Sequence, residues 1–129
     1  MFMENLTLLV NELCKLPAET EWLEFKHNKY TPTMIGEDIS ALANSATIAG
    51  HPFAYLIWGV DDTTHDILGT DNEWYAMRSK QQEIESWIRM QLSGNTELDF
   101  QRAQIDEQRH VLILKIGSAV NRPISFAKV

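Results

Sequence analysis

Two carboxylates and a lysine near the start of the chain have a spacing that could support chemistry on a phosphate. Glu24 and Lys26 lie two residues apart in Trp22–Lys26, a segment that alternates between apolar and polar side chains. This alternation predicts a β-strand, on which residues two apart share a face about 7 Å apart. Glu19 precedes them on the same stretch of chain. Carboxylates beside an ammonium suit a divalent metal and a cation that stabilises charge on a cleaved phosphate.

Two further carboxylates follow the most apolar stretch of the chain. Phe53–Val60 is almost unbroken in apolar residues, which predicts a central strand covered on both faces, and Asp61 and Asp62 come directly after it. If this strand lies beside the first, Glu19, Glu24 and one aspartate can converge. The competing interpretation is structural, because charged residues on an exposed strand face and aspartates in a turn are also ordinary.

Composition favours one domain with a real core and no membrane partner. The chain has 129 residues, of which 44% are hydrophobic, but it has no apolar run of about 18 residues and no secretory signal pattern. Cys14 is the single cysteine, so no disulfide can form within the chain, and a cytoplasmic location is expected. The histidines and the cysteine show no zinc-binding spacing.

The net charge of −7 opposes one class of partner, nucleic acid. Affinity for nucleic acid comes largely from Lys and Arg side chains that neutralise phosphates. An acidic domain can still bind if its 11 basic residues cluster on one face.

The first half of the chain predicts two helices around the first strand. Asn5–Cys14 has apolar residues at helical spacing, with Asn5 as the N-cap, and Pro17 follows it. A second helix begins at Thr31, which acts as its cap before Pro32, and is expected to run to about Asn44. Its apolar stripe can pack on the central strand.

The second half predicts further strands around a long third helix. We expect a short strand at Ile67–Leu68, a helix over Glu73–Leu92, strands at Leu98–Ile105 and Val111–Ile116, and the start of another strand at Pro123–Ala127. The order α-β-α-β-β-α-β-β predicts an α+β fold in which a mixed β-sheet packs against helices. Because the last strand has no terminator, we expect residues 1–129 to form the N-terminal domain of a longer protein.

Several of these segments together resemble one family, the Schlafen-type AlbA domain of bacterial transcriptional regulators and RecG-like proteins. The matching blocks are Glu19-x4-Glu24-Phe25-Lys26, Ile39–Ser45, Leu56–Asp62 and Leu68-Gly69, in the family's order. Asn121–Phe126 also resembles a later segment of the family. The resemblance covers most of the chain, and residues 19–69 are its specific part.

The sequence departs from the family's pattern at two places beside the candidate site. Thr47–Pro52 stands where the family often has two glycines, and Trp58 stands where it usually has a small or aliphatic residue. Both departures call into question any ligand geometry that is carried over from the family.

The resemblance implies two functions that involve nucleic acid. Bacterial members of the family are taken to bind DNA or other nucleic acid as part of regulators. In animal Schlafens a similar core is a metal-dependent RNA nuclease, for which Glu19, Glu24 and Asp61 or Asp62 would be the catalytic acids here. Glu19, Glu24 and Asp62 would then hold Mg²⁺ or Mn²⁺. The same acids also occur in members with no demonstrated cleavage.

We therefore expect a nucleic-acid (DNA)-binding domain of a bacterial transcriptional regulator, with DNA or structured RNA as the partner. The candidate phosphate contacts are Lys26, Lys29, Arg78 and Arg122. Two alternatives stay open: a divalent-metal nuclease that acts on structured RNA, and a scaffold or homo-oligomerisation module, which the acidic charge favours. Basic side chains clustered around Glu24 and Asp62 would favour either nucleic-acid function, whereas an even scatter of Lys and Arg with a large apolar patch would favour the scaffold.

Overall fold

The computed structural model describes residues 5–18, 20–92 and 96–118. In chain order, its elements are α1 (Leu6–Cys14), β1 (Leu23–Lys26), α2 (Pro32–Ile48), β2 (Phe53–Trp58), the 3-10 helix η1 (Trp74–Ala76), β3 (Arg78–Ser79), β4 (Gln82–Glu83), α3 (Ile84–Gln91), β5 (Leu98–Gln104) and β6 (His110–Gly117). The prediction of an α+β fold with a mixed sheet is confirmed.

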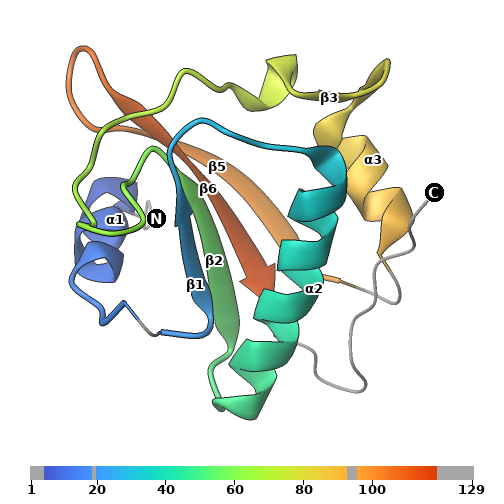
Figure 1. Ribbon diagram of the computed structural model, residues 1–129, viewed down its shortest axis with the longest axis horizontal. Coiled ribbons are helices and arrows are strands. Elements are labelled where there is room, and N and C mark those ends of the chain that lie inside the picture. Colours follow the sequence, from blue (N-terminus) through green and yellow to red (C-terminus); the bar gives the residue numbers. More distant parts are fainter. Residues whose placement is uncertain (1–4, 19, 93–95, 119–129) are drawn as a thin grey trace.

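The main sheet has the strand order β1-β2-β6-β5 (Figure 1). β1 and β2 are parallel, whereas the β2–β6 and β5–β6 pairs are antiparallel. A parallel pair needs a crossover connection, and α2 provides it. β2 thus lies between two neighbours, as its unbroken apolar sequence predicts.

Helices cover both faces of this sheet. Leu56 and Trp58 of β2 point into a core cluster that includes side chains of α2 and α3. Tyr55 and Ile57, which alternate with them, point into a second cluster that includes side chains of α1. In Figure 1, α1 accordingly lies on one side of the sheet, with α2 and α3 on the other.

The first two helices begin where the sequence predicts. The side chain of Asn5 accepts a hydrogen bond from the backbone N–H of Leu8 at 3.0 Å and caps α1. Pro32 is the first residue of α2, although the Thr31 side chain makes no capping hydrogen bond. α2 continues to Ile48, beyond the predicted end near Asn44, because the buried residue Ala46 extends its apolar stripe.

The prediction of one long helix over Glu73–Leu92 is wrong. The chain instead forms η1, the hairpin of β3 and β4, and a short α3. Lys80 has a left-handed φ of 56°, which turns the chain inside the expected helix. Met77 and Ile84 are both fully buried, but they reach the core from separate segments, after η1 and at the start of α3. Their spacing in the sequence also fits a helix, which is why the sequence predicted one.

Two other expectations concern strands. Ile67–Leu68 does not form a strand, and pairing is limited to a single bridge between Val60 and Ile67. The strand expected at Pro123–Ala127 lies outside the described residues. In the described part of the chain, no helix is both long and apolar enough to span a bilayer.

Candidate functional site

A pocket of about 560 Å³ lies beside β1 and the segments that follow β1 and β2. Lys26 pairs with Trp58 in the parallel ladder, so both strands end at the same edge of the sheet. The carboxyl ends of parallel strands are common binding sites, because the loops that follow them face each other. Glu24, Lys26, Lys29, Asp61 and Asp62 all line this pocket. The fold therefore brings together five of the side chains singled out from the sequence.

Lys26 is held between two carboxylates. Its Nζ lies 3.4 Å from Glu24 Oε2 and 3.3 Å from Asp38 Oδ2, and its side chain is only 19% exposed. The Asp38 contact is an ion pair without hydrogen-bond geometry, and Oδ2 is buried. Burial, followed by the negative charge of Glu24, raises the pKa of Asp38, while Lys26 opposes this shift. The charge of Lys26 is therefore largely compensated within the protein.

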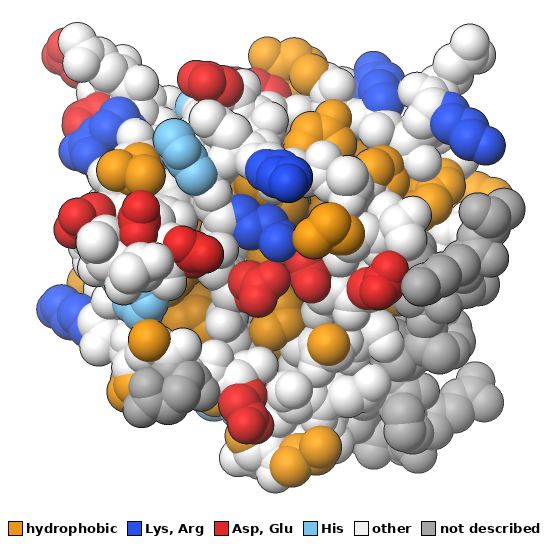
Figure 2. Space-filling view, viewed as in Figure 1, with side chains coloured by type: hydrophobic (Ala, Val, Ile, Leu, Met, Phe, Trp, Pro, Cys, Tyr) orange, Lys and Arg blue, Asp and Glu red, His pale blue; other side chains and the backbone are white. Residues whose placement is uncertain are grey.

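Lys29 has the opposite environment. It is exposed, and among the described residues no carboxylate forms an ion pair with it. Its backbone carbonyl accepts a hydrogen bond from Trp58 Nε1 at 3.1 Å. Figure 2 shows basic side chains in the middle of the viewed face, with acidic side chains beside them. Of the two pocket lysines, Lys29 is therefore the better placed to contact an added anion.

The two aspartates after β2 differ in what they bind. Asp61 Oδ1 accepts the backbone N–H groups of Thr64 at 2.8 Å and Thr63 at 2.9 Å. These bonds, first that from Thr64, lower the pKa of Asp61. Among the described residues, Asp62 Oδ1 accepts one longer bond, 3.3 Å, from the hydroxyl of Thr63. Asp61 thus stabilises the turn. The carboxylate of Asp62 makes fewer and longer hydrogen bonds within the turn, so it is the better placed of the two to contact a ligand.

Comparison with known protein families identifies the family of this domain. The family described as Schlafen, AlbA_2 matches residues 19–129. The chain belongs to this family. Among solved structures, the DIP2311 protein from Corynebacterium diphtheriae is similar at 20% identity and a TM-score of 0.44. That match covers 93% of this chain and 24% of the other, so the chain spans about a quarter of its length. No curated protein matches the chain.

Of the remaining predicted residues of this Schlafen AlbA_2 domain, only Arg78 belongs to the part of the chain that the structure describes. Arg78 lies in β3, where its guanidinium donates to the carbonyls of Tyr75 and Met77, and it is not part of the pocket lining. Glu19 and Arg122 lie outside the described residues. The predicted residues that line the pocket are therefore those on β1, in the loop after β1 and in the loop after β2.

The pocket carboxylates do not by themselves form a metal site. Within residues 5–18, 20–92 and 96–118, no three His, Cys, Asp or Glu side chains are grouped so that they could hold a metal ion. Glu24 is paired with Lys26, and Asp61 is bonded to backbone N–H groups of its own turn. The described residues thus do not fit a metal centre of three protein ligands.

Two residues at the site were missed in the sequence: Asp38, which contacts the pocket residue Lys26, and His65. Asp38 directly precedes Ile39 in the apolar stripe of α2, a position at the border of the buried face that could have indicated a partner on the sheet. His65 lines the pocket, packs edge-on against Phe25, and its Nδ1 lies 3.1 Å from the carbonyl oxygen of Cys14. Since a carbonyl only accepts, this contact requires the proton on Nδ1. No local sequence signal pointed to His65.

Proposed function

We propose that this Schlafen AlbA_2 domain binds nucleic acid at the pocket beside β1, as the recognition module of a regulatory protein. One observation carries the proposal: Lys29, an exposed lysine without an ion-pair partner among the described residues, lines the same pocket as Glu24 and Asp62. Membership of the family supports it. Basic groups beside these acids are the arrangement that favours a nucleic-acid function over a protein scaffold.

The distribution of charge limits how much nucleic acid this surface can contact. Ion pairs with carboxylates engage five basic residues of the described part of the chain: Lys15, Lys26, Arg89, Arg102 and Arg109. A protein that follows a duplex needs several free cations spaced along the backbone. A single phosphate contact through one pocket lysine instead suits the binding of a short stretch of single-stranded nucleic acid.

The rest of the pocket is compatible with one nucleotide unit. Tyr30 and Met34 line it, and Met34 is 48% exposed, so an apolar surface lies near the lysine. Bases bind apolar and aromatic side chains through their faces, whereas phosphates bind cations. A volume of about 560 Å³ falls within the range of small-ligand sites. We therefore expect tighter binding of single strands than of duplex.

A second candidate function is RNA cleavage. It is favoured by the presence of Glu24, Asp61 and Asp62 around the same pocket as Lys29. It would need Mg²⁺ or Mn²⁺, and the described residues do not complete a metal site.

The test is a titration of labelled single-stranded RNA, tRNA and duplex DNA, first in EDTA and then in Mn²⁺. We expect salt-sensitive binding in EDTA that Lys29→Gln weakens about tenfold, the scale of one charged hydrogen bond. Lys80→Gln removes the same charge from the β3–β4 turn, outside the pocket, and should leave affinity unchanged.

Three outcomes are decisive. Absence of binding at low salt, where phosphate contacts are strongest, would overturn the proposal. Equal losses in the Lys29 and Lys80 variants would show that binding is not located at the pocket. Cleavage that requires Mn²⁺ and is lost in Glu24→Gln would replace the binding function with the nuclease.

A further inference from the structure

We propose that Trp58 and Asn28 are positioning residues for Lys29, which they hold at the pocket by fixing the backbone on both sides of its side chain. The inference rests on the proposed function, since it concerns the lysine that would contact phosphate. It also gives a role to Trp58, a residue at which the chain departs from the usual pattern of its family.

Trp58 holds the carbonyl of Lys29 from inside the core. It is the last residue of β2 and is fully buried, and its ring packs edge-on against Trp74 with ring centres 5.5 Å apart. Its Nε1 donates to the carbonyl oxygen of Lys29 at 3.1 Å. Burial and the neighbouring ring fix the position of the indole. Its hydrogen bond therefore restrains the Lys29 carbonyl and the loop that carries it. An aliphatic residue at this position would offer no donor.

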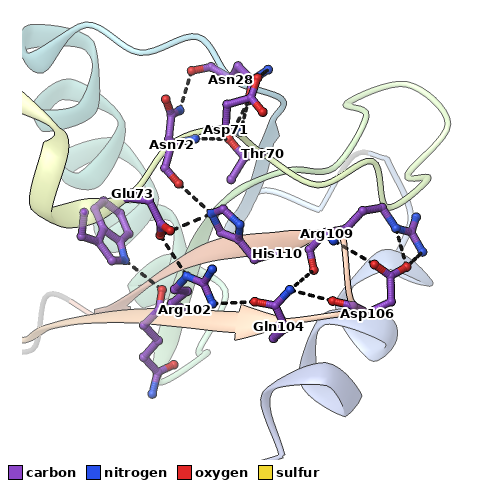
Figure 3. Close-up of polar contacts among 12 residues, drawn as sticks. Asn28, Thr70, Asp71, Asn72, Glu73, Arg102, Gln104, Asp106, Arg109 and His110 are labelled. Atoms are coloured by element: carbon purple, nitrogen blue, oxygen red, sulfur yellow. Dashed lines mark hydrogen bonds and ion pairs between the residues drawn. The ribbon is translucent and has the colours of Figure 1, made fainter.

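Asn28 directly precedes Lys29 and is itself held by hydrogen bonds to the loop at residues 70–72 (Figure 3). Its Oδ1 accepts from Thr70 Oγ1 at 2.7 Å and from the backbone N–H of Asp71 at 2.8 Å. Its own carbonyl accepts from Asn72 Nδ2 at 2.6 Å. The side chain and backbone of Asn28 are therefore both bonded to residues 70–72.

Residues 70–72 are themselves attached to the sheet. The backbone N–H of Thr70 donates to the carbonyl of His110, the first residue of β6, at 2.9 Å. The carbonyl of Asn72 lies 2.8 Å from Nε2 of the same histidine, which must donate because a carbonyl only accepts. The loop that carries Lys29 is thus connected to β2 through Trp58 and to β6 through Asn28.

The consequence is pre-organisation of one cation. The Lys29 side chain is exposed while its backbone is fixed, so contact with a phosphate orders fewer groups than it would from a mobile loop. Loss of either attachment should therefore weaken binding to nucleic acid. It should have little effect once Lys29 has been replaced by an uncharged residue.

The experiment is a double-mutant cycle on the affinity for a labelled single-stranded oligouridylate at low salt. Trp58→Phe removes the indole donor and keeps an aromatic ring. We expect it to weaken binding about threefold, the scale of one net hydrogen bond, but to have almost no effect in the Lys29→Gln background. Trp87→Phe is the matched control, because Trp87 packs against the same core cluster as Trp58 but does not line the pocket. It should leave affinity unchanged.

Asn28→Ala provides a second, independent arm, which decides the matter if the Trp58 variant does not fold. Hydrogen exchange at the backbone amides of residues 29–31 should become faster in the Asn28 and Trp58 variants and stay unchanged in Trp87→Phe. Equal weakening in both Lys29 backgrounds, or unchanged exchange in this loop, would overturn the positioning role alone. Failure of the unmodified protein to bind would overturn the proposed function, and the positioning role with it.

Discussion

Removal of the positive charge between Glu24 and Asp38 should destabilise the protein in a pH-dependent way. Lys26→Met keeps most of the side-chain stem but leaves the two carboxylates without their cation. Exposed ion pairs contribute about 0–1 kcal/mol, and removal of one partner of a buried pair costs about 3–5 kcal/mol. The side chains of Lys26 and Asp38 are 19% and 24% exposed, between these limits. We therefore expect a loss of about 2 kcal/mol at pH 7, or about 8 °C in Tm.

The pH dependence follows from the raised pKa of Asp38. A carboxyl whose pKa is higher in the folded than in the unfolded state stabilises the fold at low pH, and this contribution is lost as the pH rises through the folded pKa. Lys26 lowers the pKa of Asp38, so its removal raises that pKa further and deepens the loss at neutral pH. The variant should therefore lose less stability at pH 4.5 than at pH 7.5.

Urea unfolding at both pH values measures these losses. The second substitution Asp38→Asn should restore part of the stability of Lys26→Met at pH 7.5, because it removes the buried negative charge. Lys15→Met is the matched control, since Lys15 pairs with Glu12 at side-chain exposures of 72% and 60%. It should change stability by less than about 0.5 kcal/mol at either pH. An equal loss at both pH values, or no rescue by Asp38→Asn, would refute the electrostatic explanation.

Two further predictions concern backbone conformation. Gly59→Ala should cost about 3 kcal/mol in urea unfolding, because φ is +111° and a Cβ would lie 2.8 Å from Val111 Cγ1. Gly50→Ala, also at positive φ but with no atom within 4 Å of the added Cβ, should cost about 1 kcal/mol, and similar costs for both would exclude the clash. Lys80→Gly should stabilise the protein by about 0.5 kcal/mol by relieving its left-handed conformation, so a lower Tm would contradict this account.

The sequence by itself determined the features that depend on local chemistry. Alternation in β1 placed Glu24 and Lys26 on one face, opposite Phe25. The unbroken apolar run of β2 identified the strand with a neighbour on each side, and Asn5 identified the start of α1. In each case the residues that produce the pattern are also the residues that form the element, so no distant contact was needed.

Only the tertiary structure decided features that join distant parts of the chain. The apolar residues of the expected third helix reach the core from separate segments, because the turn at Lys80 interrupts a spacing that still fits a helix. The partner of Lys26 on α2, Asp38, depends on how that helix crosses the sheet. Likewise, Lys26 and Lys29 are equivalent as lysines in the sequence. They differ because the fold surrounds one with carboxylates and attaches the backbone of the other to Trp58, 29 residues away.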